Sequence, residues 1–456
     1  MKTLFSVLDL ISLLLFVLYA TQQVLSALQR RPKPPVAGEG ARLTFLIPAL
    51  NEAGVIGPTL DNLRRTVPGA RLVVIDDASD DGTAEIVAEL AARDPQVLLL
   101  RRHLPGARQN KSRAMKWAVE HLLTAGPLAG RDLTQEVLVV LDADGQIGPD
   151  FAPQVRGAFA DPDVMAAQGW MRFRQTGAPG GWAGVWSRML LFQQDLETFI
   201  VGRIQRLRAL GHTVALTGNG QCMRASYVAA QLARGVDPWP DVLLEDFASA
   251  LEVRLHDPRW KIALLTAKVT QQGMVASGPL IRQRARWTQG AMQCLPYLPR
   301  LWRSPAHPVT RVEFSYFILA PWLNMLLILS VLSQPVRRVL GEQGLAWPTW
   351  LGTVFTVLPL ALQLNWALRY RAERGLSWWT VPYTLLSLPV YTAALLSSTF
   401  LAYRNHFTGR QGWYKSVRHD EPGGQELSPP EVSSIQPDPH LRAAPQRSRT
   451  VASSGD

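Results

Sequence analysis

The chain has 456 residues, a formal net charge of +11 and two cysteines, Cys222 and Cys294. The length allows two or more domains, and so few cysteines exclude a secreted fold built on disulfides and favour a reducing compartment. The charge is compatible with nucleic acid, anionic lipid or phosphate-bearing substrates. The motifs described below favour the last two, and we expect no nucleic-acid partner.

Four apolar segments are long enough to cross a bilayer, which takes about 20 apolar residues. The first covers roughly Leu4–Leu25 and contains one charged residue, Asp9. The others are Phe314–Leu332, Trp347–Trp366 and Trp378–Ala402. The first could instead be a cleaved signal peptide. An uncleaved anchor fits better, because its basic flank Arg30–Lys33 would lie inside the cell. We therefore predict a multi-pass protein of the cell membrane.

The number of crossings conflicts with the charge of the C-terminal segment. With the domain between the first and second apolar segments in the cytoplasm, three later crossings would place the C-terminal tail outside. Basic residues after the last segment, among them Arg404, Arg410 and Lys415, favour the inside. One later segment would then be re-entrant or interfacial, or would divide, and we expect the region of Trp413 to be cytoplasmic.

After a Pro/Gly-rich linker, Gln29–Gly40, strands alternate with helices. This alternation predicts an α/β domain with a mostly parallel sheet. The predicted strands are Leu43–Pro48, Arg71–Ile75, Val97–Leu100 and Glu136–Leu141, and the helices between them are Val55–Thr66, Ala84–Arg93 and Lys111–Leu123.

Beyond Asp150 the pattern is looser. The segment Val164–Arg174 resembles an edge strand, and the tail after Arg418 has too few apolar residues to bury a core, which indicates disorder. The remaining predicted helices are Phe151–Phe159, Trp182–Leu207, the segment Asp241–Leu255 and Gly278–Leu301, and the remaining strands are Leu216–Met223 and Ile262–Thr270.

Two of the predicted strands end in pairs of acidic residues. Asp76 and Asp77 follow the second strand, and Asp142 and Asp144 follow the fourth. Ligands of open α/β sheets bind beyond the carboxyl ends of the strands, so these carboxylates should converge. Asp142 and Asp144 would share one face if the strand geometry persists. Mg²⁺ or Mn²⁺ typically takes one or two such carboxylates together with substrate phosphates. The alternative is two independent solvated turns.

Four further motifs each have a functional and a structural interpretation. Glu245-Asp246 could supply a general base, or could complement the dipole at a helix start. The run Gln283–Trp287 could bind phosphate and a sugar ring, or could form a basic helix at the membrane surface. Lys111, at a helix start, could bind phosphate or be solvated. Gly218-Asn-Gly permits close backbone approach to a ligand, or is a plain turn.

Taken in order, these motifs resemble those of the membrane-bound family 2 glycosyltransferases, the group that contains polysaccharide synthases. The likeness extends from about Thr44 to Trp287 and through the membrane segments. One position departs from the family pattern, because Leu244 stands where the family's T-E-D motif has Thr. The matching segments are Ile47–Glu52 with Pro48, Asn51 and Glu52, Val74–Thr83 with Asp76 and Asp77, Asn110–Ala114 with Lys111, the D-x-D of Asp142 and Asp144, Glu245-Asp246, and the Q-x-x-R-W of Gln283, Arg286 and Trp287.

The resemblance implies a GT-A fold and metal-assisted, inverting transfer from a nucleotide sugar, usually a UDP-sugar. It implies that Asp144, with Asp142 nearby, holds Mg²⁺ or Mn²⁺, and that Asp246, beside Glu245, is the general base. Arg286 would add charge at the diphosphate, and Trp287 would lie under the acceptor. The acceptor would be a growing polysaccharide or a glycolipid. The alternatives are transfer of one sugar to a lipid (polyprenyl phosphate, carotenoid or diacylglycerol), or a nucleotide-sugar-binding membrane subunit without turnover.

These expectations divide the chain into five parts. They are an anchor at 1–28, a linker at 29–42, a cytoplasmic catalytic domain at 43–300 that ends in interfacial helices, a C-terminal transmembrane region at 301–405, and a basic segment with a disordered tail at 406–456.

Overall fold

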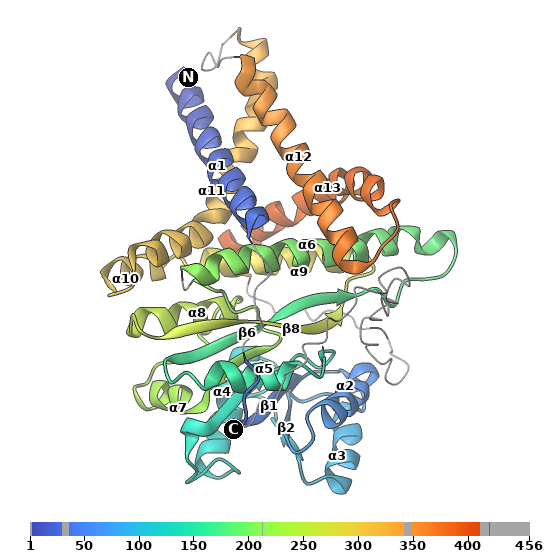
Figure 1. Cartoon of the computed structure of the whole chain (residues 1–456), viewed down its shortest axis with the longest axis vertical. Coiled ribbons are helices and arrows are strands. Elements are labelled where there is room, and N and C mark those ends of the chain that lie inside the picture. Colours follow the sequence, from blue (N-terminus) through green and yellow to red (C-terminus); the bar gives the residue numbers. More distant parts are fainter. Residues whose placement is uncertain (1, 30–35, 212, 342–348, 411–418, 420–456) are drawn as a thin grey trace, which may run out of the picture. The chain divides into compact units, whose positions relative to one another are not determined.

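In the computed structural model of the chain, the described residues are 2–29, 36–211, 213–341, 349–410 and 419. An eight-stranded sheet occupies the lower part of the molecule in Figure 1, with strand order β3-β2-β1-β4-β7-β6-β8-β5. The strands are β1 (Arg42–Ala49), β2 (Arg71–Asp76), β3 (Val97–Arg101), β4 (Glu136–Val140), β5 (Gln146–Ile147), β6 (Val164–Arg174), β7 (Gln221–Arg224) and β8 (Lys261–Gln272).

Helices cover the sheet and extend above it. The helices are α1 (Lys2–Leu28), α2 (Ala53–Thr66), α3 (Thr83–Arg93), α4 (Lys111–Thr124), α5 (Phe151–Phe159), α6 (Val185–Leu210), α7 (Ala225–Ala233), α8 (Glu245–His256), α9 (Ser277–Gln293), α10 (Tyr297–Arg303), α11 (Pro308–Val339), α12 (Thr349–Arg374) and α13 (Thr380–Phe407), with 3-10 turns η1 (Leu133–Gln135) and η2 (Trp182–Gly184).

The first four strands in the order are parallel, as predicted, and the second half of the sheet is mixed. β4 and β6 both pair antiparallel with β7, while β6 pairs parallel with β8. The prediction that β6 lies at an edge is wrong, because β7 and β8 flank it on its two sides. The predicted single helix Gly278–Leu301 is also wrong. It is two helices, α9 and α10, since Pro296 precedes α10 and lacks the N–H that a continuous helix requires there.

Successive side chains along each strand point to opposite faces of the sheet, and each face forms its own part of the core. On β1, Leu46 belongs to a cluster that includes side chains of α4, α7 and α8, whereas Phe45 and Ile47 pack in a cluster with α2, α3 and α5. This alternation follows from the period of two in a strand, and it buries both faces of the sheet. The carboxyl ends of β1, β2 and β4 are thereby fixed at one edge. The register pairs Ala49 with Asp76 and Leu46 with Val140.

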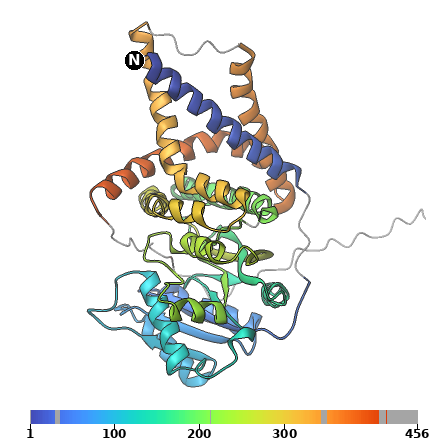
Figure 2. The same cartoon turned by 90° about the vertical axis from the view of Figure 1, so that its left-hand side faces the viewer.

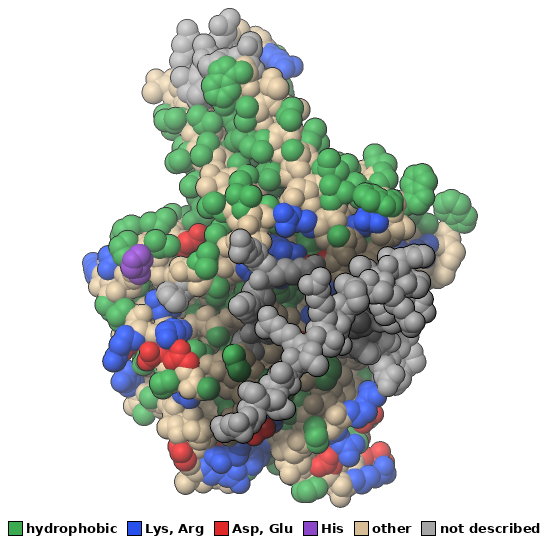
Figure 3. Space-filling model, in the orientation of Figure 1, with side chains coloured by type: hydrophobic (Ala, Val, Ile, Leu, Met, Phe, Trp, Pro, Cys, Tyr) green, Lys and Arg blue, Asp and Glu red, His purple; other side chains and the backbone are tan. Residues whose placement is uncertain are grey.

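Four helices are long and apolar enough to cross a membrane, as predicted: α1 at Phe5–Leu28, α11, α12 at Trp350–Arg374 and α13. Three of them, α1, α11 and α12, rise together from the domain, whereas α13 lies crosswise over α6 and α9 (Figures 1 and 2). Apolar side chains cover the rising helices, and basic side chains gather beneath them (Figure 3). Within this group, Asp9 on α1 and Arg337 on α11 form a buried ion pair of 2.8 Å.

The two faces of α13 differ in chemistry. Its buried face is mostly polar, and Gln193 of α6 donates to Ser387 at 2.7 Å. Its outer face is apolar, so α13 is built to lie between the domain and an apolar environment. The buried residues are Thr380, Thr384, Ser387, Tyr391, Ser398 and Ala402. The large exposed apolar residues are Tyr383, Leu386, Val390, Leu396, Phe400 and Phe407.

The chain returns to the sheet after α13. Gln289 of α9 donates to the carbonyl of Arg410 at 2.7 Å. Gln272, the last residue of β8, exchanges two hydrogen bonds with the backbone of His419, at 2.6 and 2.9 Å. Trp413 lies outside the described residues, but both described residues that flank its segment contact the domain that carries the sheet.

Candidate active site

A cavity of about 670 Å³ opens where β1, β2 and β4 end. Its wall is completed by the loop before β7, the start of α8, and α9. Eleven of the residues predicted to form the site line this cavity: Pro48, Glu52, Asp77, Lys111, Asp142, Gly218, Glu245, Asp246, Gln283, Arg286 and Trp287. The parallel strand ends and two distant helices therefore bring together residues that are up to about half the chain apart.

Three predicted residues, Asn51, Asp76 and Asp144, are not among the lining residues. The side chain of Asn51 donates to Asp80 at 2.7 Å and holds the loop after β1. Asp76 is fully buried and lies 3.3 Å from Arg101. The described contacts of Asn51 and Asp76 are thus structural, and their proposed roles toward a nucleotide stay predictions.

The D-x-D motif lies just past the end of β4. The strand ends at Val140, so the strand geometry does not persist through the motif and the two carboxylates have different partners. Asp142 Oδ1 accepts from Lys111 Nζ at 2.6 Å, in the cavity. Asp144 is fully buried, and its Oδ2 accepts the backbone N–H of Gln272 at 2.8 Å. The motif therefore presents one carboxylate to the cavity and anchors the other on β8.

Lys111 begins α4, whose N-cap Asn110 accepts the N–H of Arg113 at 2.9 Å. Burial lowers the pKa of Lys111, but the charges of Asp142, Glu245 and Asp246 outweigh burial and raise it overall. The ammonium is consequently held charged by the carboxylates of Asp142, Glu245 and Asp246. The alternative of a solvated surface lysine is wrong for this residue, because its side chain is only 15% exposed.

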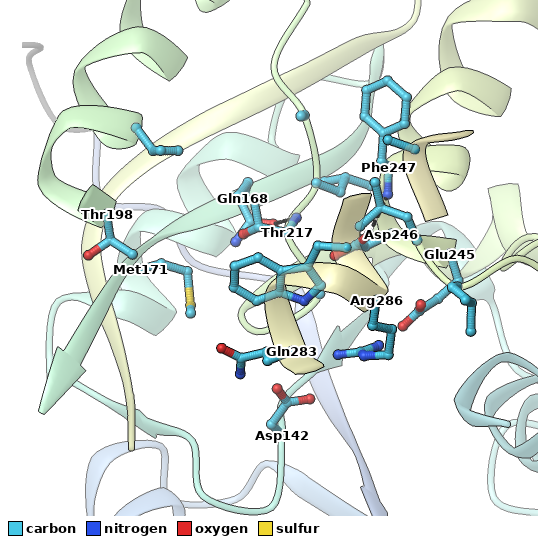
Figure 4. A pocket seen from close by; sticks show the side chains of 18 of the residues that line it. Asp142, Gln168, Met171, Thr198, Thr217, Glu245, Asp246, Phe247, Gln283 and Arg286 are labelled. Atoms are coloured by element: carbon cyan, nitrogen blue, oxygen red, sulfur yellow. Dashed lines mark hydrogen bonds between the residues drawn. The ribbon is translucent and has the colours of Figure 1, made fainter. Parts of the chain in front are cut away.

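Asp246 lies in the first turn of α8, on the cavity wall. Burial, with the neighbouring charge of Glu245, raises the pKa of Asp246 to about 7. The N–H of Phe247 and the charges of Lys111 and Arg286 oppose this rise. In Figure 4, Asp246 lies beside Thr217, while Glu245 extends on the other side, toward Arg286. A carboxylate with a pKa near the working pH suits a general base.

Gly218 lies beside this carboxylate on the cavity wall. Its φ of +77° lies in the left-handed region, and a Cβ built on it would be 3.1 Å from Asp246 Oδ2. We expect Gly218→Ala to lower kcat about tenfold, because a shift of the base that costs about 1.4 kcal/mol in the transition state has that effect. The matched control is Gly235→Ala. Gly235 has a φ of +71° and open space around it, so it introduces similar backbone strain far from the cavity. Steady-state kinetics on both variants would contradict the prediction if they lost activity equally.

The two arginines of the Q-x-x-R-W run have different surroundings. Arg284 is buried, pairs with Glu197 at 2.8 Å and lies over the ring of Trp287 at 4.1 Å. Arg286 lines the cavity and makes no ion pair within 4.0 Å among the described residues. In Figure 4 its side chain lies on the same side of the cavity as Gln283 and Asp142. Arg286 is thus available for an anionic ligand, whereas Arg284 holds α9 on α6.

The strand end of β2 presents Asp77 to the cavity. Its carboxylate accepts from Arg102 and from the N–H of Arg108 at 3.0 Å. Burial nevertheless raises the pKa of Asp77, with Arg102 partly offsetting the effect. Arg102 and Arg108 thereby fix the carboxylate at the rim of the sheet, next to the residues that follow β1.

The sequence matches two descriptions of one family: "Glycosyl transferase family 2" over residues 44–206, and "Glycosyl transferase family group 2" over residues 137–396. The second match covers more than half of the chain. The chain belongs to the family 2 glycosyltransferases. The predicted family and enzyme class are therefore confirmed.

Two relatives of this glycosyltransferase are named after a lipid. It is 27% identical to the beta-monoglucosyldiacylglycerol synthase of Synechocystis sp. over 314 residues. These residues make up 66% of this chain and 60% of that protein. It is 33% identical to the undecaprenyl-phosphate mannosyltransferase of Micrococcus luteus over 124 residues. These residues make up 27% of this chain and 46% of that protein. The chain thus spans 60% or less of the length of both relatives.

The predicted GT-A fold is confirmed by a solved structure. The mannosyltransferase PcManGT from Pyrobaculum calidifontis, in complex with GDP-Man and Mn²⁺, superposes with a TM-score of 0.56 at 17% identity. The match covers 90% of this glycosyltransferase and 99% of PcManGT. At this identity the likeness establishes the fold.

Sequence reasoning missed the side chains that hold the loop before β7. Asn219 Oδ1 accepts the N–H of Asp142 at 3.1 Å, and its amide donates to Gln271 at 2.9 Å. Gln168 of β6 donates to the carbonyl of Asn219 and accepts the N–H of Thr217 at 2.8 Å. The Gly-Asn-Gly pattern is the sequence signal for this loop, and its asparagine is the residue that ties the D-x-D motif to the loop.

Proposed function

We propose that the protein is a membrane-bound, inverting glycosyltransferase that moves a sugar from a nucleoside diphosphate donor, expected to be a UDP-sugar, to a hydroxyl of a membrane lipid. The observation that carries the proposal is the extent of one cavity. It runs from the strand ends at Asp77 and Asp142 past Asp246 to Gln22 on α1 and Asn324 on α11. A water-soluble donor and a lipid acceptor can therefore meet at one carboxylate. The names of the two relatives support the lipid acceptor over a growing polysaccharide.

In this proposal Asp246 is the general base. It takes the proton of the acceptor hydroxyl as that oxygen attacks the anomeric carbon of the donor sugar. The bond from this carbon to the diphosphate oxygen breaks on the opposite face, which inverts the anomer. Arg286 and Lys111 contribute positive charge for the departing diphosphate. Trp287 offers an apolar ring to the acceptor, with Arg284 over that ring.

The D-x-D motif fits a divalent ion that is shared with the substrate. Among the described residues, no three His, Cys, Asp or Glu side chains are grouped to hold a metal. Mg²⁺ and Mn²⁺ typically take one or two protein carboxylates together with substrate phosphates, and in this proposal those carboxylates are Asp142, which lines the cavity, and Asp144. Bound there, the ion would neutralise charge that develops on the diphosphate. The Mn²⁺ in the PcManGT complex supports this assignment.

The crosswise position of α13 supports one arrangement that removes the conflict between the number of crossings and the charge of the C-terminal segment. If α1, α11 and α12 cross the bilayer and α13 lies at the inner surface, the domain and the segment after α13 are both cytoplasmic. We expect a cysteine at Leu340, at the end of α11, to react with a membrane-impermeant maleimide on intact cells. A cysteine at Thr408, at the end of α13, should react only after permeabilisation. Cys222 and Cys294 are buried and give little background. Labelling of the Thr408 variant from outside would mean that α13 crosses the bilayer.

The enzymatic proposal is tested with purified protein in lipid nanodiscs, Mn²⁺ and a panel of radiolabelled nucleotide sugars. We expect one donor to yield a labelled product that partitions into organic solvent. A labelled polymer in the aqueous phase would support the polysaccharide acceptor instead. No turnover of any donor, combined with retained nucleotide-sugar binding, would support the binding subunit without catalysis.

A further inference from the structure

On the membrane side of Asp246 the cavity continues as an arm between α6 and α11, which we call the acceptor arm. Its walls are one face of each helix, as the spacing of three or four residues shows. The arm-lining residues are Val201, Ile204, Gln205 and Arg208 on α6 and Glu313, Tyr316, Phe317, Ala320 and Asn324 on α11. Val201 is 41% exposed and Asn324 is also exposed, so the arm opens at their level.

The mouth of the arm faces the apolar surface of the molecule. Gln22 near the end of α1 and Thr399 on α13 line the same cavity. Both helices are long and apolar enough to contact a bilayer. The rising helices and their apolar covering lie directly above α6 in Figures 1 and 3. A ligand with a hydrocarbon part can therefore enter from the membrane side while its head reaches Asp246.

Arg208 gives the arm a polar contact point. Its side chain is 6% exposed and its Nε faces Glu313, whereas its buried Nη2 has no hydrogen-bond partner among the described residues. The guanidinium carbon lies 5.6 Å from the ring centres of Phe314 and Phe317. Leaving such donors unpaired is costly, so an oxygen supplied by a ligand would stabilise the site. Burial lowers the pKa of Arg208 to about 10, and the group stays charged at neutral pH.

The charge of Glu313 determines whether the arm favours a neutral or an anionic ligand. Its Oε2 lies 3.4 Å from Arg208 Nε and balances the charge of the guanidinium. Among the described arm-lining residues Arg208 is the one cation, and the other cations of the cavity, Arg108, Lys111, Arg284 and Arg286, belong to α4, its preceding loop and α9. A lipid phosphate would meet the Glu313 carboxylate without a net positive partner. A neutral head group with ester or ether oxygens carries no charge that the Glu313 carboxylate would repel.

The inner end of the arm holds a second unpartnered group. Thr217 Oγ1 is buried and makes no hydrogen bond with any described residue, and its neighbour Gly218 lies against Asp246. The loop is fixed by Gln205, which bonds both the N–H and the carbonyl of Ala215 at 3.0 and 2.8 Å. A hydroxyl delivered through the arm would arrive between Thr217 and the carboxylate.

We propose that the acceptor is a neutral membrane lipid with a free hydroxyl near ester or ether oxygens, that it enters from the bilayer through the acceptor arm, and that Arg208 donates to one of those oxygens. This inference rests on the proposed transferase function and specifies its acceptor.

The entry route is tested by blocking the arm. In nanodiscs, wild-type protein should be photolabelled on α6 or α11 by a diazirine-bearing diacylglycerol, and unlabelled diacylglycerol should compete. Ala320→Trp should reduce labelling and sugar transfer at least tenfold. The matched control is Val331→Trp, because Val331 lies on the same helix and is 62% exposed outside the arm. If transfer occurs but Ala320→Trp leaves it unchanged, the arm is not the entry route, whereas absence of transfer in the wild type would contradict the proposed function itself.

The charge argument is tested with Glu313→Gln, which keeps the shape of the side chain and removes its charge. The proposal expects wild-type protein to prefer diacylglycerol over undecaprenyl phosphate in photolabelling. Glu313→Gln should shift the labelling ratio toward the phosphate lipid about tenfold. Wild-type preference for the phosphate lipid, or an unchanged ratio in the variant, would overturn the assignment of a neutral acceptor. Arg208→Met combined with Glu313→Met removes both charges of this ion pair and should reduce labelling by both lipids.

Discussion

Replacing Asp246 with Asn should abolish sugar transfer and, above pH 7, stabilise the fold. A positioned general base contributes about 10²- to 10⁴-fold to the rate, and Asn cannot accept the proton. The same carboxylate is costly when charged, because burial and Glu245 raise its pKa to about 7. Activity and stability should therefore change in opposite directions in one variant.

The sign of the pH dependence follows from the raised pKa. The folded protein holds the Asp246 proton up to about pH 7, whereas the unfolded chain releases it near the ordinary value of 3.8. Stability is consequently lost as the pH rises between these two values, and the loss persists above pH 7. Asp246→Asn should recover about 1–3 kcal/mol at pH 8 and little at pH 4. In the wild type, kcat/KM should rise with pH and level off above about 7.

Thermal unfolding at pH 4 and pH 8, together with transfer rates, checks both effects. The control is Asp241→Asn, in the loop just before α8. Asp241 is 46% exposed in its ion pair with Arg113 and does not line the cavity. It should change neither the pH profile nor the rate by more than about twofold. An Asp246→Asn protein that retains full transfer would remove Asp246 as the base.

The sequence predicted which segments form helices and strands better than it predicted the order of the strands in the sheet. The apolar runs at β1, β2 and β4 identify buried strands, because both faces of the sheet are covered and no polar alternation is needed. The position of β6 could not be read from its own residues. Whether a strand lies at an edge depends on its pairing with β7 and β8, which come later in the chain and form partners by long-range contacts.

Hydropathy likewise could not predict that α13 packs crosswise on α6 and α9. Its composition resembles that of a crossing helix, and its length of 28 residues is sufficient. Its row of buried Thr, Ser and Tyr side chains packs on α6 and α9, and a window average does not detect such a row. The candidate site shows the same pattern. The acidic strand ends and Asp246 were visible in the sequence, but Arg208, Thr217 and Asn219 gain their importance only from neighbours far away in the chain.

Removing the divalent ion should abolish transfer, and Asp144→Asn should come close to the same result. The two carboxylates of the D-x-D motif are not equivalent in their surroundings. Asp142 is 27% exposed and already neutralised by Lys111, whereas Asp144 is fully buried on β8. A metal shared with phosphates is worth several kcal/mol to charge stabilisation in the transition state. We therefore expect about a 10²- to 10³-fold loss for Asp144→Asn, and a smaller loss for Asp142→Asn.

Chelation with EDTA followed by titration with Mn²⁺ or Mg²⁺ separates this role from a structural one. If Asp144 holds the ion, Asp144→Asn should raise the metal concentration for half-maximal activity, while the wild type recovers fully. Asp163→Asn is the control, since Asp163 is 46% exposed beside Lys261 and far from the motif. Unchanged metal dependence in Asp144→Asn, or full activity in EDTA, would contradict the metal assignment. In Asp144→Asn the ion pair of Lys111 with Asp142 is kept, so this variant should change the metal dependence more than the affinity for the nucleotide.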